Sequence, residues 1–218
     1  MSKYNRTYHL PWSPGTTSDD RIAKDFTNLL GREIVITEKL DGENCGFTTE
    51  GVYARSHATF TTSPWSRKVR EIHETFIKNK LPQDVYMFGE NMEGIHSIEY
   101  NSLDSYFYLF GVREDKTWLS WDDVNEYSLV YDLPTVPVLF RGVVNNHDEL
   151  KSLTDKLVNQ ESFFGGMREG IVVRVTDSFI DDEFHKSALK WVRKDHVTTD
   201  SHWTRNWKPA KINKNYES

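Results

Sequence analysis

The sequence predicts an α+β protein with antiparallel β-sheets that are flanked by helices. Short runs rich in β-branched and aromatic residues recur along the chain, and amphipathic stretches interrupt them at intervals. No Gly-rich phosphate loop follows a strand, so neither a P-loop nor a dinucleotide-binding fingerprint is present. Because the 218 residues contain no long linker and no internal repeat, we expect a single domain over residues 1–218.

Four segments have the apolar spacing of helices, namely residues 18–30, 64–80, a short stretch from Ser120, and 148–160. Gly31 would end the first, which makes residues 1–32 an N-terminal helical segment. Ser63 would cap the second helix, and Pro64 would take its first turn. A Ser-x-x-Asp capping box starts the third helix at Ser120.

The predicted strands are residues 33–38, 46–49, 52–56, 85–88, 106–112, 136–140, 171–175 and 188–192. The sequence Thr49-Glu-Gly51 is typical of a hairpin turn between the second and third of these strands. Several adjacent strands of this kind favour antiparallel sheets.

The net charge of −6 argues against a protein with a uniformly basic surface that coats nucleic acid. The charge is uneven, however, because residues 186–218 hold eight basic and three acidic residues, which leaves −11 on residues 1–185. Trp191, Trp203 and Trp207 lie in the same basic stretch. Residues 195–218 are therefore expected to form a basic, Trp-rich tail that either binds phosphates and stacks on bases or is solvated, with its tryptophans on the core.

A single cysteine, Cys45, excludes an intrachain disulfide and a multi-cysteine zinc site. No apolar run approaches the roughly 20 residues that span a bilayer, and the amino terminus leads into no apolar signal segment. We therefore expect a soluble, cytoplasmic monomer with no membrane partner.

Lys39 stands at the end of a predicted strand in Glu38-Lys-Leu-Asp-Gly-Glu-Asn44. The strand would hold the lysine rigidly, and Asp41-Gly42 would turn the chain after it. Lysine becomes a nucleophile where burial or neighbouring cations favour its neutral amine. The alternative interpretation is an exposed lysine beside a common Asp-Gly turn.

Three further strand ends carry charged side chains. Glu90 lies in Phe88-Gly-Glu-Asn91, Glu169 opens Glu169-Gly-Ile-Val-Val-Arg174, and Lys190 lies in Ala188-Leu-Lys-Trp-Val-Arg-Lys194. Taken singly, each is more typical of a solvated surface residue. Together with Lys39 they form an ordered set of lysine, two carboxylates and a cation that can converge on one cleft.

This ordered set resembles the motifs of the covalent nucleotidyltransferases, which are ATP-dependent polynucleotide ligases and mRNA capping enzymes, and it is most similar to the second family of RNA ligases. The segments beginning at Lys39, Phe88, Glu169 and Lys190 resemble the nucleophile, third, fourth and fifth motifs in the correct order. Tyr106–Val112 resembles the aromatic strand between the third and fourth motifs. The resemblance runs from about residue 33 to 194 and implies a nucleotidyltransferase (adenylyltransferase) fold around an ATP cleft.

The resemblance implies an ATP-dependent RNA ligase that acts on RNA ends or a nicked RNA duplex. Lys39 would attack the α-phosphate of ATP and carry AMP, which would pass to an RNA 5′-phosphate before a 3′-hydroxyl seals the strand. The implied catalytic residues are Lys39, Glu169 and Lys190. The implied nucleotide-binding residues are Lys39, Asn44, Arg55, Glu90, Phe110, Glu169, Lys190 and Lys194.

Two of these expectations carry their own alternatives. Phe110 would stack on adenine, and Phe107 is the other candidate, although strand alternation puts it on the opposite face. Glu169 and Glu90 would bind Mg²⁺ (or Mn²⁺), or Glu169 would keep Lys39 deprotonated.

The chain departs from the family pattern in two places. Val192 stands where the fifth motif often has a second lysine, so either Lys194 takes that place or a local irregularity turns Arg193 inward. Only 24 residues follow Lys194, too few for a separate C-terminal domain, and this weighs against a capping enzyme or a standard DNA ligase.

Other functions stay open at this point. They are a ligase for DNA or mixed nicks, a non-catalytic module that binds nucleic-acid ends, and a nucleotidyltransferase that modifies proteins or metabolites. The presence of Lys39 beside Glu90, Glu169 and Lys190 argues against the binding module, because a binder needs no nucleophile. The basic Trp-rich tail counts modestly against the last.

Overall fold

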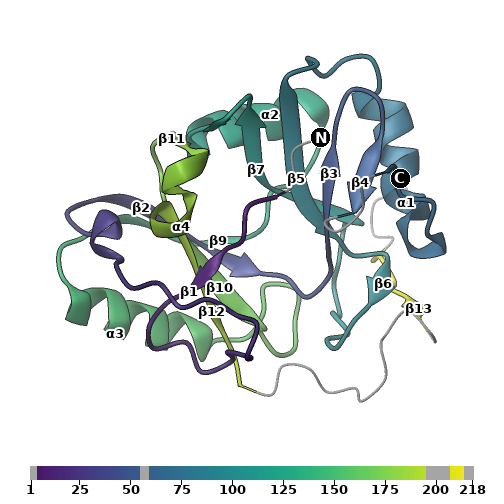
Figure 1. The fold of residues 1–218 in the computed structure, drawn as a ribbon. Helices are drawn as coiled ribbons and strands as arrows, with labels where there is room; N and C mark the ends of the chain where they lie inside the picture. Colours follow the sequence, from purple (N-terminus) through teal and green to yellow (C-terminus); the bar gives the residue numbers. More distant parts are fainter. Residues whose placement is uncertain (1–3, 55–58, 195–206, 214–218) are drawn as a thin grey trace.

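Two β-sheets form the centre of the protein (Figure 1). The structure is a computed structural model that describes residues 4–54, 59–194 and 207–213. The first sheet has the strand order β1-β12-β10-β2-β9. Its strands are β1 Tyr8–His9, β12 Ala188–Val192, β10 Gly170–Val175, β2 Arg32–Lys39 and β9 Val138–Val144. All its pairs are antiparallel except β1 with β12, which is parallel.

The second sheet has the order β11-β8-β7-β5-β3-β4 and is antiparallel throughout. Its strands are β11 Phe179–Ile180, β8 Thr117–Trp118, β7 Phe107–Glu114, β5 Val85–Asn91, β3 Glu43–Phe47 and β4 Val52–Ala54. A short pair joins β6 Gly94–Ile95 to β13 Lys208–Pro209. The predicted α+β class with antiparallel sheets is therefore confirmed, as is the hairpin between β3 and β4. A strand lies at each predicted position, but β3 spans Glu43–Phe47 instead of 46–49, and the end of the strand predicted over 52–56 lies outside the described residues.

The helices lie around the sheets. They are α1 Arg67–Ile72, α2 Trp121–Tyr131, α3 His147–Val158 and α4 Phe184–Ser187, with 3₁₀ turns η1 Thr27–Leu29, η2 Pro64–Ser66 and η4 Asp181–Glu183 and a π turn η3 His73–Ile77. The capping box at Ser120 is confirmed, because its hydroxyl accepts from the Asp123 amide while Asp123 accepts from the Ser120 amide. Ser63 is different, since its side chain makes no capping hydrogen bond.

The helix predicted over residues 18–30 is wrong. Most of this segment follows the edge of the first sheet instead, and only η1 is helical. The amide of His9 donates to Arg21 O at 2.7 Å and the amide of Ala23 donates to His9 O at 2.8 Å, so backbone bonds to β1 replace those of a helix. Ile22, which the apolar spacing of a helix would turn toward the core, is 50 % exposed.

The core lies on both faces of β2. Ile34 and Ile36 belong to an apolar cluster shared with Leu150 and Leu157 of α3, and Val35 belongs to the cluster on the second sheet. Alternating side chains of β2 thus enter different clusters, which explains why this strand reads as a continuous apolar run. Among the described residues, no helix is long and apolar enough to cross a bilayer.

Candidate active site

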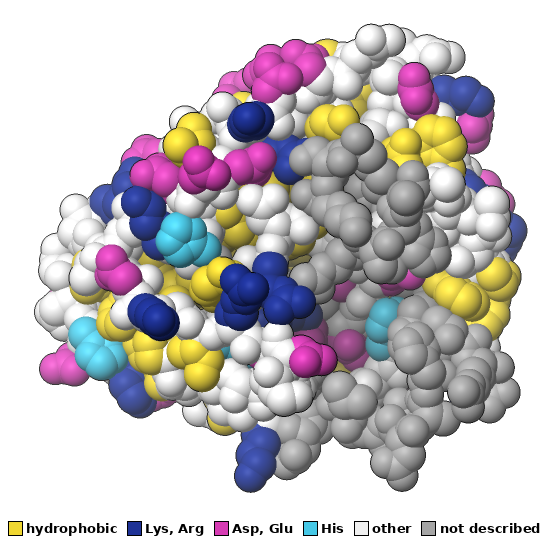
Figure 2. Space-filling view, in the orientation of Figure 1, with side chains coloured by type: hydrophobic (Ala, Val, Ile, Leu, Met, Phe, Trp, Pro, Cys, Tyr) yellow, Lys and Arg dark blue, Asp and Glu magenta, His cyan; other side chains and the backbone are white. Residues whose placement is uncertain are grey.

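A cavity of about 700 Å³ lies where the two sheets face each other. Figure 2 shows a hollow in this face of the molecule with acidic side chains and a histidine on its walls. The lining includes five of the predicted site residues, Lys39, Asn44, Glu90, Phe110 and Lys190. Residues from β2, β3, β5, β7, β10 and β12 therefore converge here, as the strand-end pattern predicts.

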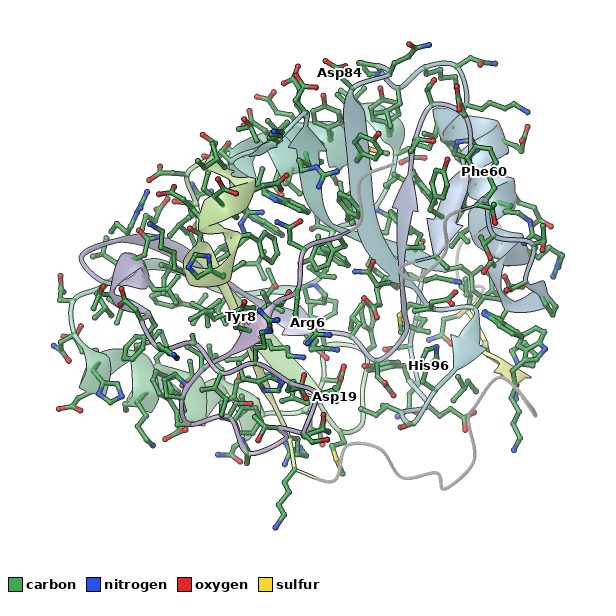
Figure 3. All side chains as sticks on the ribbon, in the orientation of Figure 1. Arg6, Tyr8, Asp19, Phe60, Asp84 and His96 are labelled. Atoms are coloured by element: carbon green, nitrogen blue, oxygen red, sulfur yellow. The ribbon has the colours of Figure 1, made fainter. Side chains whose placement is uncertain are left out.

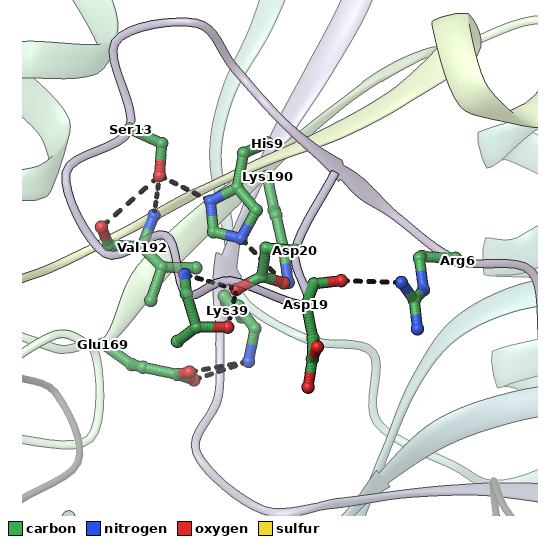
Figure 4. A network of polar contacts seen from close by, with 10 residues as sticks. Arg6, His9, Ser13, Asp19, Asp20, Lys39, Glu169, Lys190 and Val192 are labelled. Atoms are coloured by element: carbon green, nitrogen blue, oxygen red, sulfur yellow. Dashed lines mark hydrogen bonds and ion pairs between the residues drawn. The ribbon is translucent and has the colours of Figure 1, made fainter. Parts of the chain in front are cut away.

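Lys39 and Glu169 meet because of the register between β2 and β10. Gly170 lies opposite Lys39, and Glu169 directly precedes it. The Nζ of Lys39 donates to Glu169 Oε1 at 2.8 Å and to Oε2 at 2.7 Å (Figure 4). The Glu169 side chain is only 5 % exposed and that of Lys39 is 27 % exposed. The ion pair is thus largely shielded from water, where such contacts are strong.

The carboxylates around Lys39 determine its charge. Burial alone would lower the pKa of Lys39, but the charges of Glu169 and Glu90 outweigh burial and raise this pKa above its usual value. The ion pair thus favours the ammonium form of Lys39, and the expectation that Glu169 keeps the amine deprotonated stays a prediction. Lys39 must lose a proton to become a nucleophile, and the Glu169 oxygens are within reach of that proton.

Glu90 reaches the cavity from the end of β5. Burial raises its pKa to about 8, with Lys39 opposing the shift and Glu169 adding to it. Glu90 Oε1 accepts from the Gly42 amide at 3.2 Å, and Asn44 lies opposite Glu90 in the pairing of β3 with β5. A carboxyl that changes protonation near neutral pH beside a lysine is typical of a functional site.

The structure explains why Asp41 and Gly42 follow Lys39. Asp41 Oδ2 accepts from the amides of Ser97 and Ile98 at 2.7 and 2.8 Å, which ties the end of β2 to the chain after β6. A Cβ on Gly42 would lie 2.5 Å from Asn91 O, so only glycine allows the chain to pass this close to β5. Together they place Glu90 beside the lysine.

Phe110 and Val172 both line the cavity and are half-buried. Phe107, the alternative, lies elsewhere, because its ring is fully buried and stacks on Phe47 with centroids 4.3 Å apart. Of the two phenylalanines, Phe110 is therefore the one available to a planar group in the cavity.

Lys190 is held by the N-terminal segment. Its Nζ lies 3.2 Å from Asp20 Oδ1, and His9 Nε2 lies 3.2 Å from the same oxygen. His9 Nδ1 is 2.8 Å from Ser13 Oγ, which accepts from the Val192 amide at 2.9 Å (Figure 4). Burial works against the charge of Asp20, but hydrogen bonds from Thr17 and the charge of Lys190 hold the pKa of Asp20 well below its usual range. Nothing in the local sequence marked Asp20, His9 or Ser13 as site residues.

The remaining predicted cations are placed differently. Arg193 donates to Arg168 O at 3.2 Å and to Val158 O at 2.8 Å, so it binds backbone carbonyls instead of turning into the cavity. Lys194 is exposed after the end of β12 and is not one of the described residues that line the cavity. Arg55 lies outside the described residues, and its role stays a prediction.

A buried pair that sequence reasoning missed lies beside Lys39 and Glu169. Glu38 and Arg168, each next to a catalytic candidate, have an Nε to Oε2 distance of 3.4 Å and are almost fully buried. Glu38 Oε2 also accepts from the Phe163 amide at 2.9 Å. The pair therefore links β2 to the loop that precedes Glu169.

The described part of the C-terminal tail returns to the same region. β13 pairs with β6, and the ring of Trp207 lies 6.4 Å from that of Trp65, which lines the cavity. Trp191 is 8 % exposed and belongs to the core. Trp191 thus matches the interpretation in which tail tryptophans anchor on the core, whereas Trp203 lies outside the described residues.

The site fits a divalent metal ion that is bound partly by the phosphates of a nucleotide. The described residues contain no cluster of three or more His, Cys, Asp or Glu side chains that could hold a metal. Glu90 and Glu169 supply two carboxyl groups beside Lys39, and burial followed by the charge of Glu169 raises the pKa of Glu90. Mg²⁺ is commonly held by one or two carboxylates with substrate phosphates and water, and these two residues fit that pattern.

Comparisons with known proteins agree with this geometry. The family model for RNA ligase matches residues 32–192, whereas no curated protein matches the chain. Two solved structures of the Naegleria gruberi RNA ligase are similar to this chain. A variant in the apo form has a TM-score of 0.57 at 17 % identity, and a variant with AMP and Mn has a TM-score of 0.56 at 18 % identity. Each match covers 91 % of this chain and 57 % of the Naegleria chain. A protein of Aquifex aeolicus assigned as an ATP-dependent DNA ligase has a TM-score of 0.55 at 17 % identity over 90 % of this chain. The chain covers 51 % of that protein's length, so it spans little more than half of these relatives.

Proposed function

Because the chain belongs to the RNA ligase family, we propose that it is an ATP-dependent ligase that joins RNA ends bearing a 5′-phosphate and a 3′-hydroxyl. The observation that carries the proposal is the Lys39 amine, held by both oxygens of Glu169 in a cavity that Glu90, Phe110 and Lys190 also line. ATP is the co-substrate and a divalent ion the cofactor that this site would accept, in line with the ligands of the Naegleria structures.

The first step is attack of Lys39 Nζ on the α-phosphorus of ATP. A proton leaves the ammonium for a Glu169 oxygen, the N–P bond forms, and the bond from the α-phosphorus to pyrophosphate breaks. The ammonium of Lys190 neutralises charge that develops on the phosphate oxygens. Glu90 would hydrogen-bond the ribose, and adenine would lie between Phe110 and Val172.

Two further displacements complete the reaction. An oxygen of the RNA 5′-phosphate attacks the phosphorus of the lysine-bound AMP, so the N–P bond breaks and the lysine nitrogen takes back a proton. The 3′-hydroxyl then attacks the 5′-phosphorus, loses its proton and releases AMP. A bound divalent ion would supply additional positive charge at the phosphates. Positioning and charge neutralisation are the main tasks of the protein in all three steps.

Joining assays on matched substrates test the proposal and its DNA alternative. The protein would be given ATP, Mg²⁺ or Mn²⁺, and nicked or single-stranded substrates of identical sequence made from RNA or DNA. We expect ATP-dependent joining of RNA ends at a rate at least tenfold above that of DNA ends. Equal or faster joining of DNA would assign the DNA-ligase function instead, and loss of joining with Lys190→Ala but not with Lys151→Ala would tie the activity to this cavity.

A further inference from the structure

A second cavity, of about 450 Å³, lies outside the candidate active site. It is formed by the N-terminal segment and α4, and its lining residues are Tyr8, Arg21, Ile22, Ala23, Lys24, Asp25, His185 and Lys186. None of these residues lines the first cavity. This N-terminal groove has no role in the chemistry proposed above.

The groove is basic although the chain as a whole is acidic. Arg21, Lys24 and Lys186 contribute three positive charges against the single carboxylate of Asp25. Asp25 Oδ1 accepts from the amide and hydroxyl of Thr27 at 2.8 and 2.7 Å. Glu183, just outside the lining, lies 3.0 Å from Lys186 Nζ. Of the three groove cations, Arg21 and Lys24 therefore have no ion pair with a carboxylate among the described residues. Figure 2 shows Lys and Arg side chains gathered near the centre of this face, beside the hollow.

An aromatic ring lies among these cations. The guanidinium of Arg21 is 5.8 Å from the centre of the Tyr8 ring and donates to its hydroxyl at 3.0 Å. The ring of His185, which lies on α4, is 6.0 Å from the Tyr8 ring. Cations interleaved with aromatic rings are the features that bind single-stranded nucleic acid, because phosphates meet the charges and bases stack on the rings.

The groove is next to the active site along one strand edge. In the pairing of β1 with β12, Tyr8 lies opposite Leu189, and the next residue, His9, lies opposite Lys190. Figure 3 labels Tyr8 and Arg6 on the N-terminal segment and His96, which lines the active-site cavity. Because side chains alternate along a strand, Tyr8 and Lys190 point to opposite faces of the first sheet, so an RNA strand that runs from Lys190 to Tyr8 must pass around the edge strand β1.

We propose that the N-terminal groove binds the RNA strand a few nucleotides away from the end being joined, with Arg21 and Lys24 on its phosphates and Tyr8 and His185 beside its bases. The proposal rests on the proposed function, since it assumes that RNA is the substrate. An acidic peptide would use the cations but would leave the aromatic rings without a planar partner, so nucleic acid is the better match.

The test is a double variant, Arg21→Ala with Lys24→Ala, in the full chain. The matched control is Lys78→Ala with Lys80→Ala, which removes two exposed cations near η3 at a distance from the groove. Three quantities would be measured for both: adenylylation of the protein by ATP alone, joining of a 5′-phosphorylated trinucleotide, and joining of a much longer RNA at several salt concentrations.

We expect the groove variant to adenylylate itself and to join the trinucleotide like wild type. Its KM for the longer RNA should rise about tenfold. The slope of log affinity for that RNA against log salt concentration should become shallower by about 1 to 2, because two phosphate contacts are lost. The control should match wild type throughout. Equal effects on short and long RNA, equal effects of the control, or equal competition by polyglutamate would overturn the proposal. Absence of adenylylation in the wild type would instead count against the proposed function.

Discussion

The ion pair between Lys190 Nζ and Asp20 Oδ1, 3.2 Å long, joins two residues that are 170 positions apart. It ties the N-terminal segment to the cation that faces the candidate active site. In the proposed reaction Asp20 would act as a positioning residue for Lys190, because a fixed charge assists a phosphoryl displacement more than a mobile one.

Replacing Asp20 should slow the first step. In Asp20→Asn, the loss of the paired charge lets the Lys190 ammonium move, so we expect the rate constant for adenylylation at saturating ATP to fall about tenfold, a modest loss of positioning. The KM for ATP should not rise, because a negative charge near the phosphates has been removed. Single-turnover adenylylation over a range of ATP concentrations measures both.

Asp19→Asn is the matched control for this change. Asp19 is exposed, and its backbone carbonyl accepts from Arg6, whereas its carboxylate lies outside the Lys190 network. This variant makes the same charge change and should behave like wild type. If the two variants are equally slow, or if Asp20→Asn only raises the KM, Asp20 does not position Lys190.

Glu169→Gln should shift the pH dependence of adenylylation. The reaction needs the neutral amine, and Glu169 raises the pKa of Lys39, so the wild-type rate should increase with pH into the alkaline range. Without this carboxylate the pKa of Lys39 falls and the profile moves to lower pH. The maximal rate should fall about 10²-fold, since the proton acceptor is lost. A pH profile with an unchanged midpoint contradicts this assignment.

Glu90 should make the folded state less stable at higher pH. Its pKa is raised from its usual 4.5 to about 8 by burial, so the folded protein binds a proton that the unfolded chain releases. Stability from this group is complete below pH 4.5 and is lost as the pH rises to about 8. We expect Glu90→Gln to lose less in Tm than wild type between pH 5 and pH 8.

Thermal unfolding at the two pH values tests this expectation. Glu114→Gln removes an exposed carboxylate at the end of β7 and serves as the control. The control should keep the wild-type change in Tm. An identical change in all three proteins would mean that Glu90 does not carry the proton.

Gly42→Ala should impair the site through a backbone clash. The added Cβ would lie 2.5 Å from Asn91 O, so β5 and Glu90 must move away from Lys39. We expect a loss of adenylylation of at least tenfold together with a lower Tm. Gly31→Ala has a backbone φ of +70° but no atom within 4 Å of the added Cβ, so it should cost only about 1 kcal/mol of stability and leave the rate unchanged. Similar rates for the two variants would argue against close approach as the reason for Gly42.

The sequence predicted most of the sheet and the core of the site because both depend on local patterns. The charged residues at strand ends converge because antiparallel pairing brings Gly170 opposite Lys39 and Val172 opposite Lys190. The predicted helix at residues 18–30 failed for the opposite reason. Its apolar spacing fits a helix, but β1 is an edge strand of the first sheet, and hydrogen bonds to its backbone occupy Arg21 and Ala23 instead.

Two other long-range pairs escaped prediction. Asp20 with Lys190 and Glu38 with Arg168 join segments far apart in the chain, and neither pair has a sequence spacing that marks it. The charge of Lys39 likewise depends on long-range contacts, because burial lowers its pKa whereas the charges of Glu169 and Glu90 raise it.

The most direct test of the account is to identify the residue that carries AMP. Wild type, Lys39→Ala and the surface control Lys151→Ala would be incubated with labelled ATP and Mg²⁺ or Mn²⁺, and the labelled peptide mapped by mass spectrometry. The account predicts an acid-labile, alkali-stable AMP adduct on Lys39 in wild type and the control, and no adduct in Lys39→Ala. An adduct on another residue, equal labelling of Lys39→Ala, or no labelling of wild type would contradict it.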